Sequence, residues 1–169
     1  AVGQVVRIRF DPPGGTRCRL YGIRVVGDEP VPGTPSWTLA GTASSWRPMY
    51  AARLEPSASG LRVHATRPMA LIATAVQPFA AQARSILRLD LDCPGEHSIC
   101  FYWADRENSG LWGEPMDLPV EGGGPIEIDL RQYPEWKGTI TNLAIGFGTY
   151  GREVLTLRSL AIEKNDPAV

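Results

Sequence analysis

The chain has 169 residues and a formal net charge of −1, with 43% hydrophobic and 21% charged residues. This length fits one domain, and the composition is that of a globular protein rather than a disordered one. The 17 basic and 18 acidic residues are spread without a basic run, which argues against nucleic acid as a partner. No stretch approaches the roughly 18 consecutive apolar residues of a bilayer span, so membrane insertion is not expected.

Period-two alternation recurs between turn residues along the chain and predicts strands. The 18 glycines and 15 prolines interrupt the sequence too often for long helices. We therefore expect an all-β protein, an antiparallel β-sandwich with little helix. The expected strands are 4–10, 17–26, 61–66, 69–76, 85–92, 98–104, 125–130, 139–147 and 154–163, with one helical turn within 77–84.

The segment 27–60 is rich in Pro, Ser and Gly and has no clear period, so it is interpreted as a linker or long surface loop. It carries Trp37, Trp46 and Tyr50. An aromatic residue in such sequence either packs against the sandwich or stays free for a partner, and packing is favoured for all three.

One two-strand unit occurs twice, 137 positions apart and without a gap. Both copies change alternation phase at the same place, as β-bulges near Gly22 and Ser159 would require. A shared irregularity is harder to obtain by chance than shared hydrophobicity. The aligned pairs are Val6 with Leu143, Ile8 with Ile145, Phe10 with Phe147, Gly14 with Gly151, Leu20 with Leu157, Ile23 with Leu160 and Val25 with Ile162.

The repeat allows two domain organisations. In the first, 1–26 is the tail of a preceding module in a tandem array, 27–45 is a linker and 46–169 is the sandwich. In the second, 1–26 is a hairpin added at a sheet edge, where it pairs with this sandwich or with a second copy of the chain as a homodimer.

Three cysteines, Cys18, Cys93 and Cys100, are too few for a disulfide scaffold. Cys93 and Cys100 flank a turn and are close enough in sequence to pair. However, Cys93 continues the inward phase of its strand, whereas Cys100 is out of phase with Phe101 and Trp103. The alternation therefore favours two unpaired thiols.

Four segments between about residue 46 and residue 163 carry a family resemblance: SILRLDLD, ICFYWADRENSGLWGE, PIEIDLRQYPEWKGTITNLAIGFG and VLTLRSLAIEK. In order and motif they resemble the galactose-binding-like jelly-roll modules attached to bacterial glycosyltransferases and other carbohydrate-active enzymes. One departure is that the strand that often ends in Asp-Pro in such modules ends here in Gly146, Phe147 and Gly148. The first copy of the repeat keeps Asp11 and Pro12.

The resemblance implies a jelly roll that acts as a non-catalytic carbohydrate-binding module of a larger glycan-synthesising or glycan-processing protein. Its partners would be an oligosaccharide or polysaccharide and the neighbouring domains of that protein. Such a module is soluble, cytoplasmic beside a glycosyltransferase and extracellular within a secreted enzyme. The alternatives are a structural spacer that binds no sugar and, less favoured, a small glycan lyase or hydrolase.

Sugar recognition needs flat aromatic faces and nearby polar groups, and the stretch 102–114 offers both. Trp103 is in phase with the inward Phe101, which favours a core position, so Trp112 is the better stacking candidate. Trp136 is expected to cap the end of the sandwich. The stacking candidates are Tyr102, Trp103 and Trp112, and the hydrogen-bonding candidates are Asp105, Arg106, Glu107, Asn108 and Glu114.

Catalytic and metal signals are weaker. His64 lies in an expected strand and His97 in a turn, neither beside a nucleophile motif, so no catalytic residue and no cofactor is expected. Asp105 and Glu114 are the acids that a glycosidase would need, and only their separation in space would decide that chemistry. Asp90, Asp92 and Glu96 are hard oxygen ligands for a structural calcium, but they lack the spacing of a dedicated loop.

Overall fold

The structure is a computed structural model that describes residues 35–40, 45–93, 98–107, 116–118, 123–148 and 154–164. Within these ranges the chain forms short and long strands and two 3-10 turns. The strands are β1 (Ser36–Thr38), β2 (Arg47–Tyr50), β3 (Ala52–Ser57), β4 (Gly60–Ala65), β5 (Met69–Ala80), β6 (Ile86–Asp92), β7 (Ser98–Asp105), β8 (Met116–Leu118), β9 (Gly124–Asp129), β10 (Thr139–Gly148) and β11 (Val154–Glu163), and the turns are η1 (Ala81–Ala83) and η2 (Leu130–Gln132).

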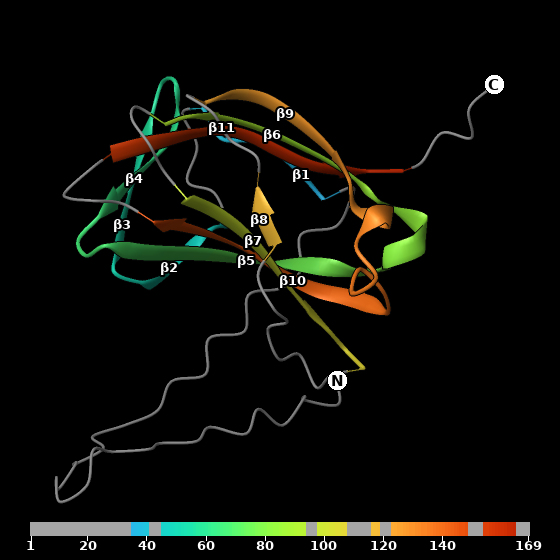
Figure 1. The fold of residues 1–169 in the computed structure, drawn as a ribbon. Helices are drawn as coiled ribbons and strands as arrows, with labels where there is room; N and C mark the ends of the chain where they lie inside the picture. Colours follow the sequence, from blue (N-terminus) through green and yellow to red (C-terminus); the bar gives the residue numbers. More distant parts are fainter. Residues whose placement is uncertain are drawn as a thin grey trace, which may run out of the picture.

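The strands form two antiparallel sheets that face each other as two layers (Figure 1). Sheet A has the order β3-β4-β11-β6-β9, and β1 also pairs with β11. Sheet B has the order β2-β5-β10-β7-β8. The predicted all-β sandwich is therefore confirmed.

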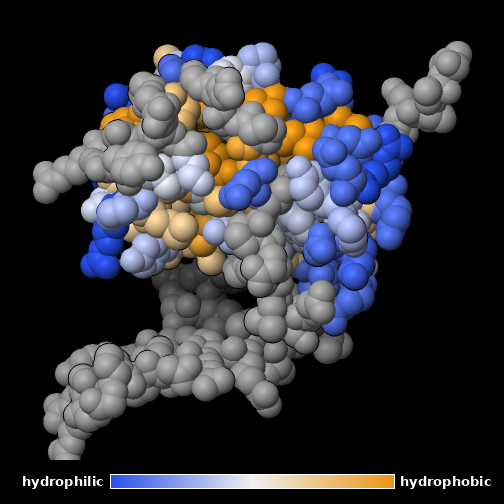
Figure 2. All heavy atoms as spheres, in the orientation of Figure 1, coloured by the Kyte–Doolittle hydropathy of each residue, from blue (hydrophilic) through white to orange (hydrophobic). Residues whose placement is uncertain are grey.

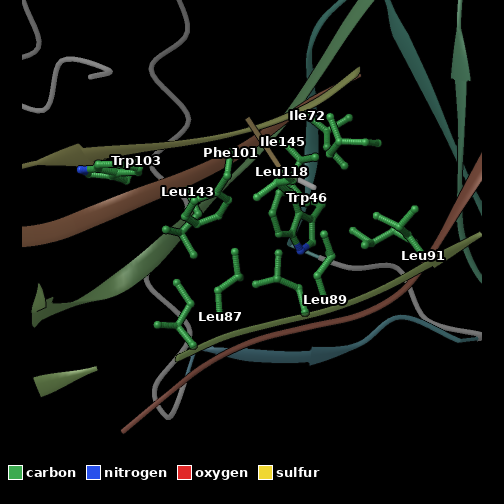
Figure 3. Packing of buried hydrophobic residues seen from close by; sticks show 14 of the residues in the cluster. Trp46, Ile72, Leu87, Leu89, Leu91, Phe101, Trp103, Leu118, Leu143 and Ile145 are labelled. Atoms are coloured by element: carbon green, nitrogen blue, oxygen red, sulfur yellow. The ribbon is translucent and has the colours of Figure 1, made fainter. Parts of the chain in front are cut away.

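The core fills the space between the sheets and follows the alternation of the sequence. In β6, Leu87, Leu89 and Leu91 are buried while the residues between them point to solvent or are half-buried. They face Phe101 of β7 and Ile145 of β10 from the other sheet (Figure 3). Burying such side chains removes apolar surface from water, which is the main force that holds the two layers together.

The second copy of the sequence repeat has the irregularity that its phase change predicts. The pairing of β11 with β6 shifts register between Leu157 and Ser159, so Arg158 is the extra residue of a bulge. This lets Leu157 and Leu160 both point into the core despite their odd spacing. Gly22 and the rest of the first copy lie outside the described residues.

The segment interpreted as linker or loop contributes three strands, β1, β2 and β3. Trp37 of β1 packs edge-on against Trp46 with ring centroids 5.7 Å apart, and Trp46 is buried, whereas Tyr50 is exposed. Packing was thus the right expectation for the two tryptophans and the wrong one for Tyr50. Because β1 pairs with β11, the sandwich also includes residues within 27–45, the range expected to be a linker.

Trp136 closes one end of the sandwich, as predicted. Its indole Nε1 donates to the carbonyl oxygens of Ala81 and Arg84, each at 3.0 Å, and its ring meets that of Trp103 edge-on at 5.3 Å. Ala81 belongs to η1, the single helical turn expected within 77–84. Hydrophilic side chains cover this end of the molecule (Figure 2).

The two described cysteines are not joined by a disulfide, and they lie on different sides of the sheets. Cys93 is buried in the core, whereas Cys100 lies on the outward side of β7, as the alternation indicated. Cys18 lies outside the described residues. No helix in the described part of the chain is long and apolar enough to cross a membrane.

Candidate binding face on the second sheet

The outer surface of sheet B combines a floor of small residues with an aromatic side chain at its centre. Because 143, 145 and 147 of β10 point into the core, the residues between them point outward. We call this surface the sheet-B face. Its outward positions are Arg47 and Tyr50 of β2, Leu71, Ala73 and Ala75 of β5, Cys100, Tyr102 and Ala104 of β7, Asp117 of β8, and Asn142, Ala144 and Gly146 of β10.

Tyr102 leans from β7 over the neighbouring strand because Gly146 has no side chain. A Cβ at Gly146 would lie 2.9 Å from Cε2 of Tyr102 and 3.5 Å from Cδ1 of Leu71. The glycine therefore makes room for the ring, which rests against the sheet and stays half-buried. A ring supported in this way is already oriented for stacking and loses little conformational freedom on binding.

The surroundings of Tyr102 further favour the protonated form of its hydroxyl. Burial, with the nearby Cys100 and Asp117, raises the pKa of Tyr102. Burial and the hydrogen bond to Asp117 also raise the pKa of Cys100, whose Sγ donates to Oδ1 of Asp117 at 3.2 Å. A protonated phenol can either donate a hydrogen bond to a sugar hydroxyl or accept one from it.

A second aromatic stands on β2, toward the opposite edge of the face. Tyr50 is 49% exposed and pairs with Leu71, which itself pairs with Gly146 beneath the Tyr102 ring. Nη1 of Arg67 approaches the Tyr50 hydroxyl at 3.4 Å. The exposed large hydrophobic residues of the described chain are Tyr50, Met49 and Met69, which belong to β2 and the adjoining start of β5.

Two residues of the predicted ligand-binding set lie inside the protein. Trp103 is 4% exposed and packs against Phe101 and Trp136 in the core, as its phase suggested. Asp105 is 7% exposed. Burial removes both from the set that could contact a surface ligand, so they are corrections to the expected site.

Glu107 has a structural partner that sequence alone did not indicate. Its carboxylate accepts hydrogen bonds from the backbone N–H and the hydroxyl of Thr139, at 2.7 and 2.8 Å. These bonds lower the pKa of Glu107. Gly138, with φ +77°, fits beside it because a Cβ there would lie 2.6 Å from Oε2 of Glu107.

Of the remaining loop candidates, only Arg106 lies within the residues that the structure describes. Arg106 is exposed, and its backbone N–H donates to the carbonyl of Thr139 at the end of β7. Asn108, Trp112 and Glu114 lie outside the described residues. The loop that carries them leaves β7 at the end of the sheet-B face marked by Ala104 and Asn142.

The outer surface of sheet A has a different character, because its charges pair with one another. Arg158 contacts Asp90 at 3.2 Å and Asp92 at 3.4 Å. Arg88 contacts both Glu127 and Glu163 at 2.9 Å. Asp90 and Asp92, two of the three expected calcium ligands, are therefore paired with Arg158, which a calcium ion would have to displace.

The third expected calcium ligand, Glu96, lies outside the described residues. Among those that are described, no group of three or more His, Cys, Asp or Glu side chains is placed to hold a metal. His64 Nε2 lies 2.9 Å from Oε2 of Glu55 on the charged sheet, where Glu55 also contacts Arg53 and Arg62.

Comparison with solved structures finds proteins of similar fold. CtCBM11, in a study of its solution structure, dynamics and binding, aligns with TM-score 0.52 and 12% identity over 80% of this chain and 99% of that one. The non-crystalline cellulose-specific carbohydrate-binding module CBM28 aligns with TM-score 0.50 and 13% identity over 82% and 97%. The chain has the fold of carbohydrate-binding modules.

Part of a larger protein has a similar fold. Xylanase10C from Cellvibrio japonicus, in complex with xylopentaose, aligns with TM-score 0.51 and 11% identity over 76% of this chain and 28% of that one. This chain thus spans less than a third of the enzyme's length. No protein-family model and no curated protein matches the sequence.

Proposed function

We propose that this chain is a non-catalytic carbohydrate-binding module of a larger glycan-synthesising or glycan-processing protein, and that its ligand is an oligosaccharide or polysaccharide bound on the sheet-B face. The observation that carries the proposal is the Tyr102 ring, held over Gly146 at the centre of a floor of small residues. The solved proteins of similar fold include a module described as specific for non-crystalline cellulose and a xylanase solved in complex with xylopentaose, which supports the ligand class.

The physical argument rests on what a sugar presents to a protein. A pyranose ring has an apolar C–H face that stacks on an aromatic ring, and hydroxyls around its edge that need hydrogen-bonding partners. Tyr102 supplies the aromatic surface, and Asn142 and Asp117 are polar groups on the same face. Small neighbours such as Ala144 keep the floor low beside the ring.

The loop after β7 is proposed as the rim of this site. From it, Trp112 would add a second stacking surface, while Arg106, Asn108 and Glu114 would bind hydroxyls. Trp103, Asp105 and Glu107 are left out because their observed packing and hydrogen bonds give them structural work.

The experiment is a glycan array that includes xylan, cellulose and agarose oligosaccharides, probed with the wild type and Tyr102→Ala. We expect selective binding that weakens by about tenfold or more in the variant, the loss of roughly 1.4 kcal/mol of contact. Tyr102→Phe keeps the ring and tests the hydroxyl alone. Arg158→Ala, on the other sheet, is the matched control and should bind as the wild type does.

Trp112→Ala tests the rim, and loss of binding there with unchanged melting would extend the site into the loop. Silence of the wild type across the array would instead favour the spacer function. Turnover of an oligosaccharide by the chain, abolished by Glu114→Gln, would overturn the non-catalytic assignment.

A further inference from the structure

Outward positions of sheet B line up in a row that crosses the whole sheet. Paired residues on neighbouring antiparallel strands lie directly opposite each other, so the row runs across the strands rather than along one of them. A ligand that follows this row would also cross the strands. Read along the backbone pairing from β8 to β2, the row consists of Asp117, Cys100, Gly146, Leu71 and Tyr50.

Two aromatic rings stand on this row. The ring of Tyr102 lies over Gly146, and Tyr50 is a member of the row on β2. Because β5 alone separates β10 from β2, Gly146 and Tyr50 are two strand spacings apart, roughly 10 Å. Leu71 of β5 lies between them, and its Cδ1 would be 3.5 Å from a Cβ on Gly146. The two rings are therefore separated by an apolar floor.

A bulge in β2 gives Tyr50 its outward position. The register of β2 against β5 shifts between Pro48 and Tyr50, so Met49 is the extra residue. Without that extra residue, the alternation would place Met49 opposite Leu71. Bulges redirect side chains in this way and are frequent beside functional sites. Here the redirected side chain is a large aromatic that is 49% exposed.

The corner after Tyr50 is strained and is held by Thr66. Ala51 has φ +46°, in the left-handed region that residues with a side chain rarely adopt. Its carbonyl oxygen accepts hydrogen bonds from the backbone N–H and the hydroxyl of Thr66, at 2.8 and 3.0 Å. Such a conformation persists where the surrounding contacts fix it. The backbone that carries Tyr50 is therefore defined although the ring is exposed.

The spacing of the two rings indicates the shape of a ligand that could use both. In an extended β-1,4-linked glycan, each sugar advances the chain by about one strand spacing, and alternate sugars present the same face. Two strand spacings thus place one sugar on Tyr102 and the second sugar after it on Tyr50, with the intervening sugar over Leu71. Each ring can stack on the C–H face of its sugar. An α-1,4-linked chain curls and cannot lie along both rings.

We propose that the sheet-B face binds an extended β-1,4-linked glycan across its strands, with Tyr102 and Tyr50 as the stacking surfaces for sugars two positions apart. The inference rests on the proposed function and adds to it a linkage, a minimum length of three sugars and the role of Tyr50. Asp117 at one end of the row, and Arg67 beside the Tyr50 hydroxyl at the other, are polar groups for the hydroxyls of the flanking sugars.

The test measures affinity against chain length by calorimetry. Cello-oligosaccharides and manno-oligosaccharides of two, three and four sugars are the β-1,4-linked probes, and malto-oligosaccharides of the same lengths are the matched α-1,4-linked probes. For the wild type we expect affinity to rise by about tenfold from two to three sugars in a β-linked series, with weaker binding of the malto-oligosaccharides. Tyr50→Ala should remove this rise and leave disaccharide binding unchanged. Tyr102→Ala should weaken the binding of every length.

Two further variants separate stacking by Tyr50 from a structural role. Tyr50→Leu keeps an apolar side chain beside Leu71 but has no flat ring, so it should lose the rise with length as Tyr50→Ala does. Met49→Ala, at the bulge residue that is 47% exposed, is the matched control and should bind every length as the wild type does. The melting temperature of each variant shows whether it is folded.

The remaining outcomes distinguish this inference from the proposed function. The wild-type dependence on length in both Tyr50 variants, a loss that is equal at every length, or equal binding of malto-oligosaccharides would overturn the role of Tyr50 and the linkage. A wild type that binds neither β-linked series but selects another glycan on the array would overturn the inference and leave the proposed function in place. Silence across the whole array would contradict both.

Discussion

The two outer faces of the sandwich are built on the same strand alternation but have opposite chemistry. On sheet A, Arg158 and Arg88 are engaged by carboxylates of the same surface. On sheet B, the outward positions of β10 are small, and an aromatic ring from β7 lies over one of them. The charges on the outer face of sheet A therefore pair with one another, while the outer face of sheet B presents an aromatic ring that is available for stacking.

The adjacent residues Trp103 and Tyr102 on β7 point to opposite sides of sheet B, the first into the core and the second outward. Trp103→Ala should destabilise the fold by about 3–5 kcal/mol, since it empties a core site against Phe101 and Trp136. Tyr102→Ala, one residue away and on the other side of the sheet, should cost much less. Chemical denaturation measures both, and equal losses would show that Tyr102 serves packing rather than recognition.

Gly146→Ala tests whether the glycine positions the ring. The added Cβ would stand 2.9 Å from Cε2 of Tyr102, so the ring must move away from its place on the sheet. We expect binding to weaken several-fold on the glycan array, with a smaller effect on stability than Trp103→Ala. Gly148→Ala is the matched control on the same strand, where a Cβ would meet the small Ser98 side chain at 3.2 Å. Equal losses of binding in both variants would argue against a special role for Gly146.

The contribution of Glu107 to the stability of the fold should depend on pH. Two hydrogen bonds from Thr139 lower the pKa of Glu107 from its usual 4.5, so the carboxylate stabilises the fold above that pH. This contribution is lost as the pH falls through the lowered pKa. Glu107→Gln should therefore flatten the fall in Tm between about pH 5 and pH 3 relative to the wild type. Parallel curves for the two proteins would contradict the role of the Thr139 contact.

Arg158→Ala should have the smallest effect. Its ion pairs with Asp90 and Asp92 lie on the surface, where such pairs contribute about 0–1 kcal/mol and are screened by salt. The difference in unfolding free energy from the wild type should shrink further in about 1 M NaCl. A large loss that persists in salt would mean that this surface does more than pair its own charges.

The sequence predicted the central strands because their alternation is strong. β6 has leucine at every second position, and β10 and β11 repeat the pattern with a bulge that could be anticipated from the phase change at Ser159. β1 and β2 were missed because they are short and mostly exposed, and β3 because its burial does not alternate strictly; β2 and β3 also contain proline. Their place is set by pairing with strands distant in sequence.

The candidate site was predictable only in part, for the same reason. Tyr102 was recognised as an aromatic in a polar context, yet its support by Gly146 depends on the pairing of β7 with β10. Glu107 carries the residue type of a sugar ligand, but Thr139, which holds it, lies 32 residues away in sequence. The residue types suggested sugar binding, whereas tertiary contacts determined which of these side chains are available to bind a ligand.

The most direct test of the account is a titration of the ¹⁵N-labelled chain with the soluble oligosaccharides used on the array, followed through its backbone amide signals. The account predicts that perturbed signals cluster around Tyr102, Ala144 and Gly146, while those around Asp90 and Arg158 stay in place. Perturbations centred on sheet A, with the sheet-B face silent, would contradict it.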